Sequence, residues 1–195
     1  MSLSNYALIS LEDIREALGL EASETDDDNL LTSLINRIST RIESYCGRKF
    51  VGRLYTEYQD GDGEAYVALD QYPIIMVSGL WDDTDRDFED EDEISSDDYL
   101  IYEEEGYIKL YNDESTFIDG SQNIKIIYSG GYNPVPDDLK GACAEAVMQS
   151  YRRIKEKHFG YSSRSSQGGS LSLDLSSWPN ETKLTLNHYK KISVY

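Results

Sequence analysis

The sequence predicts an α+β fold, in which a helical core of two long and two short helices carries an inserted small antiparallel β-sheet subdomain. Two observations support this prediction. Apolar residues follow a helical period over residues 11–50 and again over residues 135–157. The roughly eighty residues between them consist of short segments rich in tyrosine and β-branched residues, which is typical of strands.

These patterns also divide the chain into four expected parts. Residues 1–53 form the N-terminal helical part of the core, and residues 54–129 form the β-rich insert. Residues 130–160 form the second long helix, and residues 161–195 form a flexible arm followed by a C-terminal element. A chain of 195 residues can bury a substantial core, so one domain with an inserted subdomain is the expected organisation.

The first short helix is expected to start after Ser10 and to end near Leu18. A serine hydroxyl can cap free backbone amides, and Asp13, three residues later, favours the positive end of a helix. Gly19 then suits the left-handed conformation that ends many helices.

A long helix is expected to follow and to end at residues 46–50. Gly47 suits a left-handed cap, and Arg48 and Lys49 favour the negative end of the helix. Five apolar residues on one face are the predicted core-packing residues of this helix, namely Leu31, Leu34, Ile35, Ile38 and Ile42.

The second long helix is expected to begin after Pro134 and Pro136, which suit a helix start, with two aspartates in its first turn. Small and apolar residues form one stripe along it, so another helix can approach closely. The predicted core-packing residues of this stripe are Leu139, Ala142, Ala146 and Ile154. Basic residues at 152–157 are typical of compensation of the helix dipole, and a nucleic-acid site is the alternative.

Six strands are expected in the insert, at residues 55–59, 66–69, 74–77, 99–101, 107–110 and 123–128. Glu103–Gly106 is expected to be a hairpin turn, and Asp60–Glu64 a tight hairpin connection between the first two strands. The alternating carboxylates of Asp60–Glu64 also leave a calcium loop open as an alternative, although the flanking helices of an EF-hand are missing.

The net charge of −19 is concentrated in residues 82–98, where eleven acids and one arginine give a net charge of −10. Because this segment repels itself and contains little apolar content apart from Phe88 and Ile94, a solvated loop is expected. A functional alternative is that the segment repels DNA or meets a basic partner surface.

No catalytic, metal or cofactor site is predicted. The sequence contains no phosphate-binding loop, nucleophile elbow or zinc-protease motif, and its two histidines leave little for a triad. Cys46 and Cys143 have no metal or redox spacing and are expected to be small core residues. No apolar run reaches the roughly 18 residues of a membrane span, and the N-terminus lacks a signal-peptide pattern, so we expect a cytoplasmic protein without a membrane segment.

Two segments in this order resemble the head-tail connector (adaptor) proteins of long-tailed bacteriophages and related prophages. The first is the end of the long helix, Ile42–Phe50, and the second is Gly130–Tyr132 followed by Val135–Ala142. Between them lies the strand-rich insert that begins with Tyr55–Asp60. The acidic middle and the serine-rich stretch after Gly160 depart from the shorter members of that family.

The resemblance implies a structural virion protein at the head-tail interface, assembled in the bacterial cytoplasm. In that family a ring, here expected to have about twelve subunits, lies below the portal protein, extends the DNA channel and docks a head-completion (stopper) or tail protein. DNA is expected to pass without sequence-specific binding. The alternative from another class is an acidic DNA mimic, or another binding protein that targets a basic host protein.

The arm after Gly160 is the predicted contact with a neighbouring subunit or the portal. Leu171, Leu173 and Leu175 alternate with polar residues, as in a strand with one apolar face, and Trp178 follows. A mobile segment of this kind can add to another subunit's sheet or groove. The alternative is an edge strand within the same chain. Residues 179–189 are expected to form a last short helix or an extended packing element.

Overall fold

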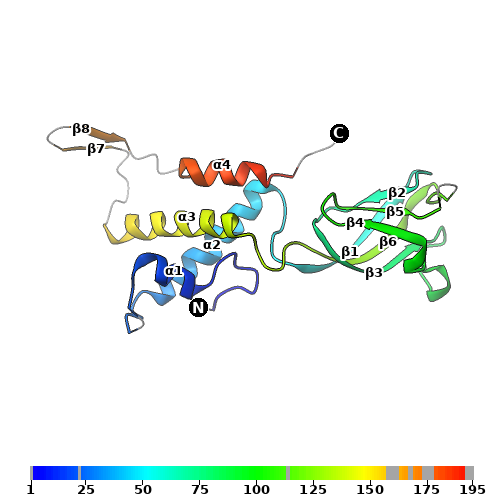
Figure 1. Cartoon of the computed structure of the whole chain (residues 1–195), viewed down its shortest axis with the longest axis horizontal. Helices are drawn as coiled ribbons and strands as arrows, with labels where there is room; N and C mark the ends of the chain where they lie inside the picture. Colours follow the sequence, from blue (N-terminus) through cyan, green and yellow to red (C-terminus); the bar gives the residue numbers. More distant parts are fainter. Residues whose placement is uncertain are drawn as a thin grey trace. The chain divides into compact units, whose positions relative to one another are not determined.

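A computed structural model describes residues 2–21, 23–112, 115–156 and 178–191 and, for the backbone alone, residues 163–166 and 169–172. It confirms the α+β class, with four helices and two three-stranded antiparallel sheets (Figure 1). The chain divides into two compact units, which we call the helical unit (Met1–Arg48 with Val135–Tyr195) and the β unit (Lys49–Pro134). The β unit contains 22 acidic and five basic residues, a net charge of −17, which leaves −2 on the helical unit.

The helical unit contains α1 (Leu11–Leu18), α2 (Asp28–Cys46), α3 (Asp137–Lys155) and α4 (Asn180–His188). The cap predictions at Ser10, Gly19 and Gly47 are confirmed. Ser10 and Asp13 form a capping box at the start of α1, and Gly47 ends α2 with φ 69° while donating its N–H to the Glu43 carbonyl.

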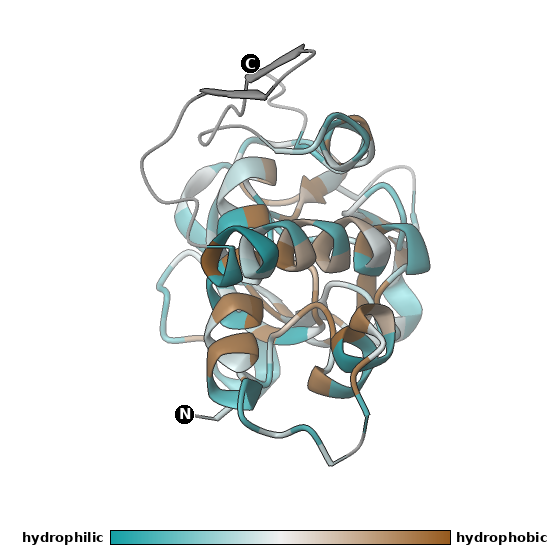
Figure 2. Ribbon diagram, turned by 90° about the vertical axis from the view of Figure 1, so that its left-hand side faces the viewer, coloured by the Kyte–Doolittle hydropathy of each residue, from teal (hydrophilic) through white to brown (hydrophobic). Residues whose placement is uncertain are grey.

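The helices pack through their apolar faces. Helix α3 contacts α1, α2 and α4, and the helices near the viewer in Figure 2 carry brown and teal on different sides, as amphipathic helices do. The buried apolar residues of the unit include Ile14 on α1, Val147 on α3 and Leu186 on α4. The C-terminal element expected at residues 179–189, either a short helix or an extended segment, is the helix α4.

The first sheet of the β unit has the order β1–β6–β3, with β1 at Arg53–Gly61, β6 at Gly120–Gly130 and β3 at Ile74–Asp82. Strand β6 is the central strand and pairs antiparallel with both neighbours. Its alternate side chains point to opposite faces of the sheet. Ile124, Ile126 and Tyr128 are buried on one face, and Lys125 and Ile127 are half-buried on the other, as the alternation predicts.

The second sheet has the order β2–β5–β4, with β2 at Tyr66–Ala68, β5 at Tyr107–Leu110 and β4 at Tyr99–Tyr102. Its buried residues join those of the first sheet in one apolar core, made of Val67, Leu69, Ile74, Leu80, Tyr99, Ile108, Leu110, Phe117, Ile124, Ile126 and Tyr128. Each sheet therefore has one face in the core and one face outside it.

The two connections expected to be hairpins have different outcomes. Glu103–Gly106 joins the paired strands β4 and β5, and Gly106 takes φ 76° there, so this turn is confirmed. The prediction for Asp60–Glu64 is wrong, because β1 pairs with β6 and β2 pairs with β5. The segment instead carries the chain from one sheet to the other, and the turn residues alone did not reveal which strands pair.

Strand β3 extends five residues beyond its expected end at Val77. Gly79 lies inside the strand next to a register shift. A Cβ atom at Gly79 would lie 2.2 Å from the ring of Trp81. Glycine is thus needed here because the Trp81 ring covers the backbone, and the strand continues past it.

The arm contains two paired strands, β7 (Ser163–Ser166) and β8 (Gly169–Ser172). The expected apolar strand overlaps β8 at Leu171, whereas Leu173 and Leu175 lie outside the described residues.

Candidate functional site

The predicted core-packing residues lie in the interior of the helical unit. Leu31, Leu34, Ile35, Ile38, Ile42, Leu139, Ala142 and Ala146 are buried, and Ile154 is half-buried. Small residues on α3 allow α2 to approach, since Ser39 Oγ lies 3.8 Å from Cys143 Sγ. These side chains pack within the helical unit.

Both cysteines are free thiols in this interior. Burial raises the pKa of Cys143 to about 12 and the pKa of Cys46 to about 11. Because the reactive form of cysteine is the thiolate, these thiols are unsuited to nucleophilic catalysis or metal binding at neutral pH.

Trp178, one of the residues predicted to contact a neighbour, is buried in its own helical unit. The Arg41 guanidinium lies over its ring, and Tyr45 meets the ring edge-on with centroids 6.1 Å apart. Of the other three predicted contact residues, the side chain of Leu171 and all of Leu173 and Leu175 lie outside the described residues. The contact role of these four residues stays a prediction.

The acidic segment is more ordered than the solvated loop expected from composition. It contains two short 3-10 helices, at Asp90–Asp92 and Ser96–Asp98. The Ile94 N–H donates to the Leu80 carbonyl at 2.7 Å, and the Phe88 ring lies 5.5 Å from the Tyr58 ring. Phe88 and Ile94, the apolar exceptions in the acidic run, therefore attach it to the sheet.

Asp83 organises the start of this segment. Its Oδ1 accepts the N–H of Asp85, and its Oδ2 accepts the N–H groups of Asp87 and Phe88, at 2.8 to 2.9 Å. These bonds hold a backbone with φ 62° at Arg86 and φ 53° at Phe88. Hydrogen bonds from the backbone, first that of Phe88, keep the pKa of Asp83 below its ordinary value.

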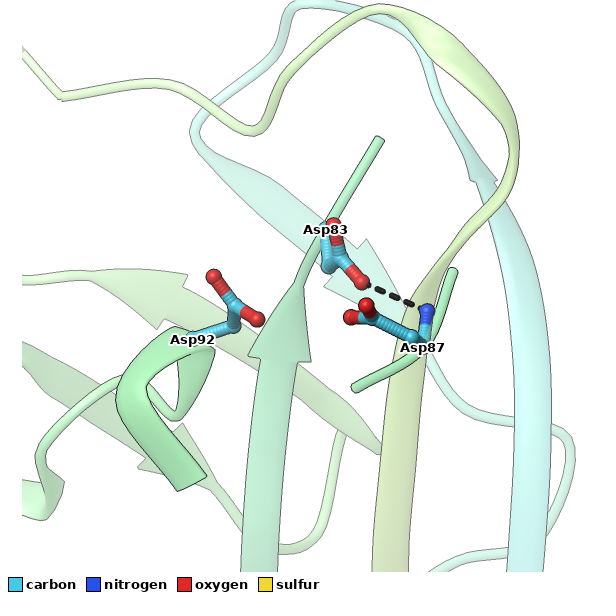
Figure 3. A group of neighbouring side chains, drawn as sticks. All are labelled: Asp83, Asp87 and Asp92. Atoms are coloured by element: carbon cyan, nitrogen blue, oxygen red, sulfur yellow. Dashed lines mark hydrogen bonds between the residues drawn. The ribbon is translucent and has the colours of Figure 1, made fainter. Parts of the chain in front are cut away.

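Three carboxylates of this segment lie close together, those of Asp83, Asp87 and Asp92 (Figure 3). They offer oxygen atoms within 4.8 Å of one another, the ligand type that calcium prefers. Both oxygens of Asp83, however, already accept backbone N–H groups. The hydrogen bonds of the loop account for this geometry without an ion.

The carboxylates of Asp60 and Asp62, considered above for calcium, also hold backbone. Asp60 Oδ1 accepts from the Gln122 N–H at 2.7 Å and from the Ser121 hydroxyl at 3.2 Å. Asp62 Oδ1 accepts from the Glu64 N–H at 3.0 Å. These hydrogen bonds stabilise the connection between β1 and β2, which runs from one sheet to the other.

The outer face of the β2–β5–β4 sheet gathers three tyrosine side chains, of which Tyr66 is exposed and Tyr102 and Tyr107 are half-buried. The sequence did not single them out as a site. In the strand register, Ala68, Tyr107 and Tyr102 form one row across the sheet, and Tyr66, Lys109 and Leu100 form the next. We call these six residues the tyrosine face. The alternation of Tyr107 and Lys109 with buried Ile108 and Leu110 was the available signal, but it did not tell which strands are neighbours.

The described part of the chain contains one histidine, His188, which is exposed at the end of α4. No helix among the described residues is long and apolar enough to cross a membrane.

Three solved structures share the fold along the whole chain. A chain in the neck of an empty gene transfer agent particle computed with C6 symmetry has a TM-score of 0.66 at 13% identity, covering 100% of this chain and 95% of that chain. A chain in the neck of the native particle computed with C12 symmetry has a TM-score of 0.61 at 14% identity, covering 100% of this chain and 94% of that chain. A chain from the virion of the native particle has a TM-score of 0.62 at 13% identity, covering 100% of this chain and 95% of that chain.

No curated protein sequence matches this chain. The family described as "Head completion protein" matches residues 7–192, nearly its full length, and this match bears out the resemblance to phage connector proteins. The chain belongs to the head completion protein family.

Proposed function

We propose that copies of this chain form a ring in the neck of a phage or phage-like particle, below the portal protein, where the ring extends the DNA channel. The ring then receives a head-completion (stopper) or tail component. One observation carries the proposal: the chain belongs to the head completion family over residues 7–192 and shares its whole fold with proteins from particle necks. Those necks were computed with C6 and C12 symmetry, and the C12 symmetry of the native particle supports a ring of about twelve subunits here.

The role is structural. Membership of a head completion family indicates that the protein acts by assembling into the particle and not as an enzyme. The raised pKa values of the Cys46 and Cys143 thiols agree with this. The location that follows is the head-tail interface of the virion.

A closed ring needs two different complementary patches on each subunit. Leu184 on α4 is 65% exposed, whereas Leu186, two residues later, is fully buried. We infer that Leu184 belongs to a contact with a neighbouring subunit or the portal.

The arm at residues 162–176 is the second proposed contact, because its alternating leucines suit strand addition to a neighbour. Deleting residues 162–176 should leave a folded protein that joins portals poorly. Unchanged portal binding would remove the arm from the proposal.

The ring is tested by measuring native mass by light scattering, for the protein alone and with the portal protein encoded nearby in the same genome. A particle of about a dozen subunits, alone or on the portal, is expected. Leu184→Ser should weaken this assembly while Lys183→Ser, at the adjacent exposed position, should not. A protein that stays monomeric or dimeric regardless of portal would contradict the proposal.

The acidic β unit supports one alternative, a DNA mimic that binds a basic host protein, because it carries a net charge of −17. A mimic needs carboxylates spaced along a rigid surface as phosphates are, whereas Asp83 here turns its carboxylate onto its own backbone. Titration with a cationic DNA-binding protein separates the two, since tight stoichiometric binding is expected of a mimic alone.

A further inference from the structure

The tyrosine face is a partly exposed aromatic surface on an acidic unit. The rings of Tyr102 and Tyr107 are stacked with centroids 4.2 Å apart, and Tyr66 meets Tyr107 edge-on at 6.4 Å. Tyr66 is 53% exposed and Leu100 43% exposed. Tyrosine combines a large contact area with little conformational entropy to lose, which is why it is enriched in protein interfaces.

A hollow of about 330 Å³ opens in this face and is lined by Tyr66, Ala68, Glu105, Tyr107 and Lys109. Three of these five side chains are aromatic or aliphatic, and the space is enough for one or two apolar side chains. Burial, followed by the neighbouring Tyr102 and Glu105, raises the pKa of Tyr107. This agrees with a tyrosine that stays neutral and packed.

Charge decides which kind of partner fits. The turn at Glu103–Glu105 places three consecutive exposed carboxylates beside the tyrosine face, against the single cation Lys109. The β unit as a whole carries a net charge of −17. A nucleic acid is repelled by such a unit, whereas a basic protein segment is attracted to it.

We propose that the tyrosine face docks an extended segment of another protein, which inserts an apolar side chain into the hollow and places arginine or lysine residues against Glu103–Glu105. The proposal concerns a different surface from Leu184 and the arm, so it goes beyond ring formation. Aromatic anchors surrounded by a charged rim are the usual composition of an interface hot spot.

The test uses the full-length protein labelled with ¹⁵N and a synthetic peptide, Gly-Ser-Gly-Leu-Arg-Arg-Arg-Gly-Ser-Gly, followed by amide NMR. The expected result is that shifts concentrate in β2, β4, β5 and the Glu103–Gly106 turn. Replacing the arginines by citrulline, or the leucine by serine, should each weaken binding, because the first removes charge and the second removes the anchor.

The acidic segment at residues 82–98 is an internal control, since it is the most acidic stretch of the chain. Shifts that concentrate there, or that survive the leucine-to-serine change, would mean simple charge attraction and would overturn the proposal. An absence of shifts on the tyrosine face would overturn it as well.

Matched variants assign the binding to side chains. Tyr107→Ser should raise Kd about tenfold, and Glu104→Gln should raise it less. Tyr6→Ser, in the helical unit, and Glu91→Gln, in the acidic segment, alter exposed residues outside the β2–β5–β4 sheet and should leave Kd unchanged. Equal effects of the two tyrosine variants would contradict the proposal.

Shifts of the same amides on diluting the protein without peptide would instead assign the face to contact between copies of this chain.

Discussion

The guanidinium carbon of Arg41, on α2, lies 4.3 Å from the centroid of the Trp178 ring, which precedes α4. Tyr45, one turn further along α2, meets the same ring at its edge. Trp178 is only 8% exposed. The tryptophan thus joins the C-terminal helix to α2 through a cation–π contact and an aromatic contact.

Trp178→Ala should lower the free energy of unfolding by about 3 kcal/mol, because it removes a buried aromatic side chain and leaves a cavity. Urea denaturation measures this. Leu184→Ala, at a highly exposed position on the same C-terminal segment, should change stability by less than about 0.5 kcal/mol. Equal effects of the two variants would show that Trp178 does not hold α4 in place.

Ala146→Asp should prevent folding of the helical unit or assembly of the protein. Ala146 is 3% exposed on the face of α3 that carries the small residues, so an aspartate there buries an unpaired charge at a cost of several kcal/mol. Circular dichroism and light scattering check this outcome. Gly141→Asp, on the exposed side of α3, is the control and should fold, and a normally folded Ala146→Asp protein would refute the packing role of the stripe.

Gly141→Ala should raise the free energy of unfolding by about 0.5 to 1 kcal/mol. Gly141 lies inside α3, and a Cβ atom there would meet nothing within 4 Å. The gain comes from the unfolded chain, which has fewer conformations to lose. Thermal melting measures it, and Gly19→Ala should act in the opposite direction because Gly19 has φ 69°.

Acidification should loosen the start of the acidic segment. Because the pKa of Asp83 is lowered in the folded state, its contribution to stability is complete above the ordinary value of about 3.9 and is lost as the pH falls through the lower folded pKa. The pKa of Asp87 is raised, chiefly by burial and then by Asp83, so Asp87 takes up its proton first.

The amide NMR signals of Asp85, Asp87 and Phe88 follow this transition between pH 6 and pH 2. In Asp83→Asn the same signals should lack the low-pH step, because the amide side chain does not ionise. Asp87 can add an earlier step at higher pH, and a midpoint of the low-pH step itself above about pH 4 would contradict the assignment to Asp83.

Local signals along the chain predicted the elements of this fold. The Ser10–Asp13 capping box, the Gly47 cap and the alternation along β6 each depend on residues close together in the chain, so propensity and periodicity were sufficient. The segments that resembled connector proteins were local as well, and the family match over residues 7–192 agrees with them.

The pairing of strands, in contrast, could not be predicted from local sequence. The prediction that β1 and β2 form a hairpin failed because each strand pairs with one more than 30 residues away in the sequence. Strand β3 was expected to end at Val77, yet it continues past Gly79, where the absence of a side chain leaves room for the Trp81 ring. The tyrosine face was invisible for the same reason, since it combines residues of β2, β5 and β4 whose order depends on long-range pairing.

The sequence by itself therefore determined the α+β class, the helix limits at Ser10 and Gly47, and the concentration of acid in the β unit. These features follow from backbone propensity, side-chain period and charge, which act over a few residues. Only the tertiary structure decided that Asp83 folds the acidic segment back on itself, that Trp178 lies beneath Arg41, and that three tyrosines share one face. Contacts between residues distant in the chain depend on which apolar faces are buried together, and no local pattern specifies that choice.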